Sequence, residues 1–168
     1  NFNMDDGLPD NAFRPGAVFG RYEKIFFGTG NGMLFFDPDS IQYNSDPPPV
    51  YITGLKVLEN QRDLPEKSIE LPYDQNYISF DFTALDYQSP ENLRYAYMLE
   101  NFNEDWIDSD TRRYAAYTDL NPGKYVFRVK ASNSDGVWND TGVAIPVVIT
   151  PPVWQTVWFN GAVIVILG

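Results

Sequence analysis

The sequence predicts an all-β protein whose main part is a two-layer β-sandwich. Several segments between residues 50 and 150 alternate apolar and polar side chains with a period of two, as half-buried strands do. Turn signals such as DLNPGK and NSDG separate these segments. No stretch of ten or more residues before the C-terminus shows a helical period. About seven strands divided by such turns indicate two sheets packed face to face.

The segment 77–85 (YISFDFTAL) shows the alternation most clearly, because Ile78, Phe80, Phe82 and Ala84 share one parity. The same pattern recurs in 93–99 (LRYAYML), 124–132 (KYVFRVKAS) and 143–149 (VAIPVVI). Two irregularities carry information. In 50–58 (VYITGLKVL) the apolar parity changes at Gly54, which predicts a β-bulge there. Pro146 lies on the opposite parity of its segment, which suits an edge strand.

The most specific local motif is LNPGKYVFRVKASNSDG, residues 120–136. Pro122 and Gly123 form a turn, and Tyr125 follows at the mouth of a strand. This arrangement resembles the tyrosine corner of immunoglobulin-like and fibronectin-III-like sandwiches, in which the ring packs inward and the hydroxyl binds backbone at the turn. The motif predicts a fold and says almost nothing about a ligand.

Composition restricts the function. The 168 residues are 43% hydrophobic and 16% aromatic, so they can bury a sizeable core, and the net charge of −11 argues against nucleic-acid binding. The chain has no cysteine and no histidine, which excludes Ser-His-Asp, Cys-His and zinc constellations within it. Catalysis by paired carboxylates is disfavoured rather than excluded. We expect no cofactor and no metal.

The N-terminal region contains two apolar runs joined by GTGNG, residues 28–32. The spacing G-x-G-x-G could suggest a phosphate loop, but the helix and the lysine that cradle phosphate do not follow it. A hairpin with a glycine turn is the better interpretation. The segment SDPPPV (45–50) then forms a stiff joint, because three consecutive prolines do not fit inside a sheet or a helix.

These residues together carry a family resemblance. The segments GLPDNAF (7–13) and FFGTGNGMLFFDPDSI (26–41) resemble the last blade of the β-propeller in the periplasmic sensor regions of hybrid two-component regulators. The segments from PPPVYITGLKVLEN to RRYAAYTDLNPGKYVFRVKASNSDGVW resemble the sandwich that follows this propeller, a module named for its recurring tyrosines. PPVWQTVWF resembles the junction with the membrane helix. The resemblance covers nearly all of the chain.

The resemblance implies three parts. Residues 1–46 would be a terminal β-propeller blade fragment, and residues 47–152 would be the Ig-like/fibronectin-III-like β-sandwich. Residues 153–168 would be a membrane-proximal segment and the start of a transmembrane helix. A single blade cannot bury both of its faces without neighbours.

The resemblance also implies a function at the periplasmic face of the inner membrane. Upstream propellers of the same chain would bind oligosaccharide, and the sandwich would couple that binding to a transmembrane helix and a cytoplasmic histidine kinase. The fragment itself would not be an enzyme, whereas the full-length protein would be a sensor histidine kinase. A homodimer through the sandwich is expected, with membrane contact through the segment after Trp158. The phospho-accepting histidine cannot lie in this chain, which has none.

Several aromatic residues are candidates for a binding site. Tyr95 and Tyr97 share parity with Leu93 and Leu99, which favours core packing over a sugar site. Trp106, in NFNEDWIDSD, could stack on a sugar ring or plug the open end of the sandwich. Trp138, in DGVWND, has the same two interpretations. Burial statistics for tryptophan favour the plug in both cases, so the two residues are weak ligand-binding candidates.

Charged residues give weaker candidates. The carboxylates of one loop do not meet the geometry of a glycosidase pair, which spans a cleft. The loop ASNSDG lacks the ligand pattern of an EF-hand, so metal binding is not expected. Two adjacent arginines could contact an anion, although a surface charge pair is the simpler interpretation. These residues are Glu104, Asp105, Asp108, Asp110, Arg112 and Arg113.

The C-terminal run VWFNGAVIVILG follows Trp154 and opens with Trp158 and Phe159. Aromatics before an apolar run are typical of a membrane boundary, so the start of a transmembrane helix is favoured over a last buried strand. The alternative function, from a different class, is a carbohydrate-binding or interaction sandwich module of a secreted glycan-degrading enzyme. That module would bind an oligosaccharide by itself, whereas the coupling domain would not.

Overall fold

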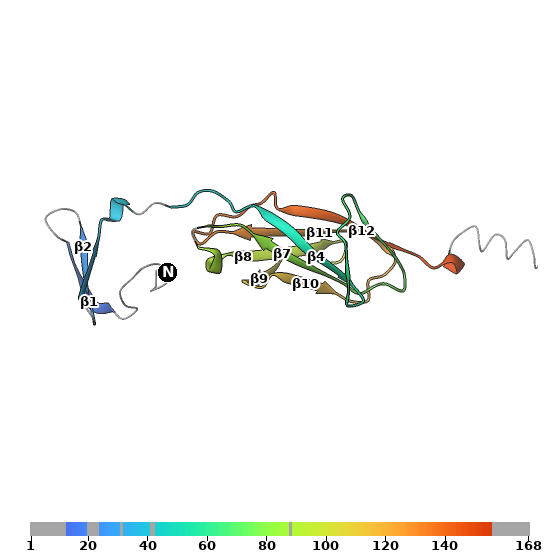
Figure 1. The fold of residues 1–168 in the computed structure, drawn as a ribbon, viewed down its shortest axis with the longest axis horizontal. Helices are drawn as coiled ribbons and strands as arrows, with labels where there is room; N and C mark the ends of the chain where they lie inside the picture. The colour runs from blue at the N-terminus through green and yellow to red at the C-terminus, as the bar shows by residue number, and fades with distance from the viewer. Residues whose placement is uncertain (1–12, 20–23, 31, 41–42, 88, 156–168) are drawn as a thin grey trace, which may run out of the picture. The chain divides into compact units, whose positions relative to one another are not determined.

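A computed structural model describes residues 13–19, 24–30, 32–40, 43–87 and 89–155 (Figure 1). The chain divides into two compact units, Asn1–Tyr43 and Asn44–Gly168. The helices of the described residues are the short 3-10 turns η2 (Pro38–Ser40), η3 (Pro90–Asn92) and η4 (Val153–Gln155). All other regular structure in these ranges is β-strand, which confirms the predicted all-β fold class.

The first unit contains an antiparallel sheet in the order β1 (Phe13–Phe19), β2 (Ile25–Thr29), β3 (Gly32–Phe36). The pair Thr29↔Gly32 closes the β2–β3 ladder at the glycine-rich turn. The hairpin interpretation of this turn is therefore confirmed. The assignment of residues 1–46 to a propeller blade stays a prediction.

The second unit is a sandwich of two sheets. The four-stranded sheet has the order β10-β7-β4-β5, and the five-stranded sheet has the order β6-β12-β11-β8-β9. The strands of the first are β4 (Val50–Val57), β5 (Asn60–Arg62), β7 (Ile78–Ala84) and β10 (Tyr114–Tyr117). Those of the second are β6 (Ile69–Pro72), β8 (Arg94–Glu100), β9 (Ile107–Asp110), β11 (Gly123–Ser132) and β12 (Val143–Thr150).

The two irregularities of the sequence have different outcomes. The register between β4 and β7 shifts between Ile52 and Gly54, which confirms the bulge. A Cβ at Gly54 would lie 2.8 Å from Asp81 Oδ2 and 3.2 Å from Asp81 Cβ, so any other residue at the bulge would displace the Asp81 side chain. The edge-strand prediction for β12 is wrong. β11 pairs with one side of β12, and β6 runs parallel along the other side from Val147, one residue beyond Pro146.

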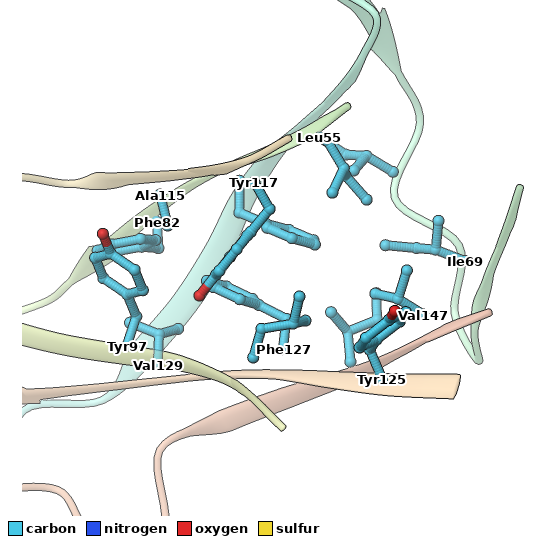
Figure 2. Packing of buried hydrophobic residues seen from close by; sticks show 14 of the residues in the cluster. Leu55, Ile69, Phe82, Tyr97, Ala115, Tyr117, Tyr125, Phe127, Val129 and Val147 are labelled. Carbon is cyan, nitrogen blue, oxygen red and sulfur yellow. The ribbon is translucent and has the colours of Figure 1, made fainter. Parts of the chain in front are cut away.

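The core fills the space between the two sheets. Alternate residues of β7, β8 and β11 are buried, as the period-two pattern predicts, and Ala96 on the opposite face of β8 is buried as well. Figure 2 shows Phe82 and Tyr117 from one sheet facing Tyr97, Phe127 and Val147 from the other. This interleaving of bulky side chains gives the unit one contiguous apolar interior.

The chain enters and leaves the sandwich at opposite ends (Figure 1). The segment from Asn44 to Pro49, here called the leading segment, precedes β4 along the loop that joins β11 to β12. The exit follows the far end of β12 at Thr150. β12 therefore runs from the loop beside the leading segment to the point where the chain leaves the sandwich.

Candidate functional site

The tyrosines of β8 are core residues with satisfied hydroxyl groups. Tyr95 is fully buried and Tyr97 is 7% exposed. The backbone N–H of Ala84 donates to the Tyr95 hydroxyl oxygen at 3.2 Å, and Arg112 Nη2 donates to the Tyr97 hydroxyl oxygen at 3.0 Å. Both rings pack against Phe82, with centroids 5.6 and 6.1 Å away. The prediction of core packing for these two residues is confirmed.

Tyr125 forms the predicted corner. Its ring is buried, and its hydroxyl donates to the Asn121 carbonyl oxygen at 2.9 Å. Tyr117 uses a side chain instead and donates to Asn103 Oδ1 at 3.0 Å, the same oxygen that accepts the Leu99 N–H. Burial, together with the nearby Tyr97, raises the pKa of Tyr117 well above its usual value. These hydroxyls are therefore engaged in holding loops onto the core.

Arg112 joins the core to the surface. Its guanidinium lies 5.3 Å from the centroid of the Tyr114 ring and 5.8 Å from that of Tyr97, to which it also donates a hydrogen bond. Arg113 donates instead to the Pro90 carbonyl oxygen at 3.2 Å. Both arginines thus have partners within the sandwich, and Arg112 contributes packing and a hydrogen bond rather than a simple surface charge.

The two candidate tryptophans meet at one lysine. The Lys130 ammonium lies 4.8 Å from the centroid of Trp106 and 5.2 Å from that of Trp138, and it donates to Asp140 Oδ1 at 3.0 Å. Trp106 is 39% exposed, so it lacks the burial expected of an end plug, and Trp138 is half-buried outside the core cluster. Lys130 points outward from β11, so the cluster covers the outer face of the five-stranded sheet. Whether it also binds a ligand stays a prediction.

The loop carboxylates do not converge on one point. Asp108 Oδ1 accepts the backbone N–H of Asp110, and Asp110 pairs with Arg94 at 3.7 Å on the exposed surface. Across the ranges that the structure describes, no group of three or more acidic residues is placed to hold a metal ion. Glu104 and Asp105 lie in the exposed turn between β8 and β9. Of these side chains, that of Asp108 stabilises the local backbone and that of Asp110 forms a surface ion pair.

The C-terminal prediction falls mostly outside the described residues. Trp158, Phe159 and the apolar run after them lie there. Trp154, in η4, is 52% exposed and its ring meets that of Tyr73 edge to face, with centroids 5.3 Å apart. No helix within the described ranges has the length and apolar character needed to cross a membrane.

The architecture defines a class of protein: a two-sheet β-sandwich domain with an aromatic core, which the chain enters and leaves at opposite ends. Comparison with known proteins agrees. Residues 86–150 match the family described as the Y_Y_Y domain. Histidine kinase P4 of Formosa agariphila is 26% identical over an alignment of 171 positions that covers 94% of this chain. The chain spans 12% of that relative.

Solved structures agree as well. The extracellular domain of the hybrid two component system BT3049 from B. thetaiotaomicron superposes with a TM-score of 0.76 at 27% identity, over 90% of this chain and 22% of that one. The extracellular domain of BT4673 from the same organism shares the fold, with a TM-score of 0.58 at 21% identity over 87% of this chain and 20% of that one. Residues 86–150 of the sandwich thus resemble a Y_Y_Y domain, and the chain resembles the extracellular region of hybrid two-component sensors.

Proposed function

We propose that this chain is the membrane-proximal extracytoplasmic part of an oligosaccharide-responsive two-component sensor, at the periplasmic face of the inner membrane. Its role is to couple ligand binding in upstream propellers to a transmembrane helix and a histidine kinase. The observation that carries the proposal is the likeness to the BT3049 extracellular domain along 90% of the chain. The path of the chain, in at one end of the sandwich and out at the other, suits a module placed in series between two others.

The packing of the core supports a rigid coupler. Phe80, Phe82, Tyr95 and Phe127 are at most 1% exposed, and their rings form a continuous series of contacts between the sheets. Close-packed interiors have low compressibility and transmit strain. A displacement at one end of the sandwich therefore reaches the other end without being absorbed by the core.

The coupling that we propose acts between two copies of the chain. A signal needs at least two arrangements whose populations the ligand changes. In a homodimer through the sandwich, the two rigid units would change their separation or angle when oligosaccharide binds upstream. The helices that follow residue 158 would carry this change across the membrane. The kinase and its phospho-accepting histidine belong to the remainder of the full-length protein, because this chain has no histidine.

The test measures the distance between two sandwiches in the intact receptor. The chain has no cysteine, so Gln61→Cys on the exposed strand β5 gives one nitroxide site per sandwich once other cysteines of the receptor are replaced. Double electron–electron resonance in lipid vesicles would be recorded with and without the oligosaccharide mixture that induces the receptor's target genes. The expected result is a shifted distance distribution. Identical distributions would falsify the proposal.

A second measurement separates the coupler from a carbohydrate-binding module. The 168-residue chain would be titrated by calorimetry with the same oligosaccharides. A coupler gives no binding heat, whereas the module of a secreted enzyme binds. Trp106→Ala then shows whether any binding observed depends on the tryptophan cluster.

A further inference from the structure

The loop between β11 and β12, residues 133–142, holds the leading segment through side-chain amides. Asn133 Nδ2 donates to two carbonyl oxygens of the segment, those of Asn44 at 2.7 Å and Asp46 at 3.2 Å. Asn139 Nδ2 donates to the Pro48 carbonyl oxygen at 2.9 Å. The carbonyl groups of residues 44, 46 and 48 alternate along the chain, so one edge of an extended segment faces the loop.

Asn133 is built into this position. It is 2% exposed, and each end of its amide is used. Its Oδ1 accepts the backbone N–H groups of Asp135 at 3.1 Å and Val137 at 2.9 Å, while both Nδ2 bonds go to the leading segment. The oxygen therefore shapes the loop, and the nitrogen binds the segment. A side-chain amide can accept two hydrogen bonds and donate two, and Asn133 uses all four positions.

Two neighbours complete the contact. Asp135 Oδ2 accepts the backbone N–H of Asn44 at 2.7 Å, on the same side of the segment. Asn139 Oδ1 accepts the N–H of Gly142 at 3.1 Å, which fixes the asparagine that reaches Pro48. Gly142 has φ +53°, and a Cβ there would lie 2.4 Å from the Val129 carbonyl oxygen, so the loop conformation depends on glycine.

The composition of the segment explains why side chains hold it. Pro47, Pro48 and Pro49 have no N–H group, so the segment cannot form an ordinary β-ladder. Its carbonyl groups remain available, and the loop supplies donors to them. Pro48 is buried, and the Pro49 carbonyl oxygen accepts the Leu85 N–H at 3.0 Å on the opposite side. The prolines thus lie in a fixed, extended path.

We propose that residues 133–142 form a binding site for an extended, proline-containing segment, and that residues 44–48 of the same chain occupy it. The site, here called the asparagine clamp (Asn133, Asp135 and Asn139), converts the proline joint into a fixed extension of the sandwich. It lies directly before β12, the strand that leads to the exit. A movement of the leading segment is delivered to the start of β12.

The test places nitroxides at Ser45→Cys and Lys124→Cys in the full 168-residue chain. Ser45 is exposed in the leading segment, and Lys124 is exposed near the other end of β11. Eight residues of strand between positions 124 and 132 put the labels roughly 26 Å or more apart, within the measurable range. A single narrow distance peak is expected. A broad distribution in this otherwise unchanged chain overturns the proposal.

Asn133→Asp then removes only the donor. Aspartate keeps the oxygen that accepts from Asp135 and Val137, but it places a carboxylate oxygen against two carbonyl oxygens. Asn139→Asp does the same at Pro48 and serves if the first variant does not fold. Asn60→Asp is the matched control, because its Nδ2 donates to a carbonyl oxygen far from the clamp, that of Leu58. The narrow peak should be lost in the clamp variants and kept in the control. A narrow peak in all three overturns the proposal.

The role of the clamp in signalling rests on the proposed function, and a separate measurement tests it. Asn133→Asp in the intact receptor should leave oligosaccharide binding unchanged and reduce the transcriptional response. If the distance experiment shows the clamp and the response is unaffected, the clamp stands and its part in coupling is wrong.

Discussion

The rings of Phe80 and Phe127 stack across the two sheets, with centroids 3.9 Å apart and planes inclined by 4°. Phe80 lies on β7 and Phe127 on β11, and both side chains are fully buried. The two central strands of the sandwich are therefore joined at one aromatic contact. Phe82, Tyr97 and Tyr117 surround Phe127 at centroid distances of 6.2 to 6.3 Å.

Phe127→Ala should lower the free energy of unfolding by about 3–5 kcal/mol, because it leaves a cavity at the centre of this cluster. Tyr87→Ala is the control, since Tyr87 is 95% exposed, and it should change stability by no more than about 0.5 kcal/mol. Urea unfolding followed by near-ultraviolet circular dichroism measures both. Equal midpoints for the two variants would contradict the central position of Phe127.

Tyr125→Phe should lower stability by about 0.5–1.5 kcal/mol, the net value of one hydrogen bond. The change keeps the buried ring and removes the hydroxyl that donates to the Asn121 carbonyl oxygen. Tyr43→Phe, at a side chain that is 79% exposed, provides the control. Thermal unfolding should give a lower midpoint for Tyr125→Phe than for Tyr43→Phe. A Tyr125→Phe variant as stable as the unmodified chain would show that the hydroxyl bond to Asn121 does not stabilise the fold.

Stability should fall at alkaline pH through Tyr117. The pKa of Tyr117 is raised in the folded chain, so its contribution is complete below about pH 10, the ordinary tyrosine value. As pH rises beyond that value, the unfolded chain releases the proton while the folded chain retains it, and the free energy of unfolding decreases. Urea midpoints between pH 8 and pH 11 should show a shallower decline for Tyr117→Phe than for Tyr87→Phe. Parallel curves would refute the assignment.

Lys130→Gln should expose the tryptophan cluster. The ammonium group lies against both Trp106 and Trp138, and cation–π contacts of this kind contribute about 0.5–2 kcal/mol. The variant should lose stability in this range and shift the tryptophan emission to longer wavelength. Lys56→Gln, which removes a lysine paired with Asp81 on the other sheet, should leave the emission unchanged. An unaltered spectrum in Lys130→Gln would show that the contact is unimportant.

The sequence predicts the parts of the fold that obey local rules. The alternation in β7, β8 and β11 and the parity change at Gly54 can be recognised without a partner strand, because each strand's own residues record which face is buried. The number of strands is underestimated, since β5, β6, β9 and β10 have only three or four residues. The position of β12 within the sheet depends on β6, whose pairing leaves no trace near Pro146.

The candidate site was less predictable for a related reason. Asn133 and Asn44 are 89 residues apart in the sequence. The segment NSDG has the local pattern of a turn and forms one, so nothing in it indicates a second, distant contact. The sequence signal that could reveal this contact is a pair of asparagines in one loop together with a proline run that cannot donate hydrogen bonds. Trp106 and Trp138 were recognised as a pair of similar candidates, yet their meeting point, Lys130, lies on a third segment.

The placement of β12 bears on how the domain would respond to mechanical load. β11 binds this strand on one side, and β6 binds it in parallel on the other side over its last four residues. A pull on the exit, directed along the strand, would stretch many ladder bonds together in shear instead of opening them one after another. The domain should therefore unfold last at β12, the strand that would bear tension from the membrane anchor that we propose.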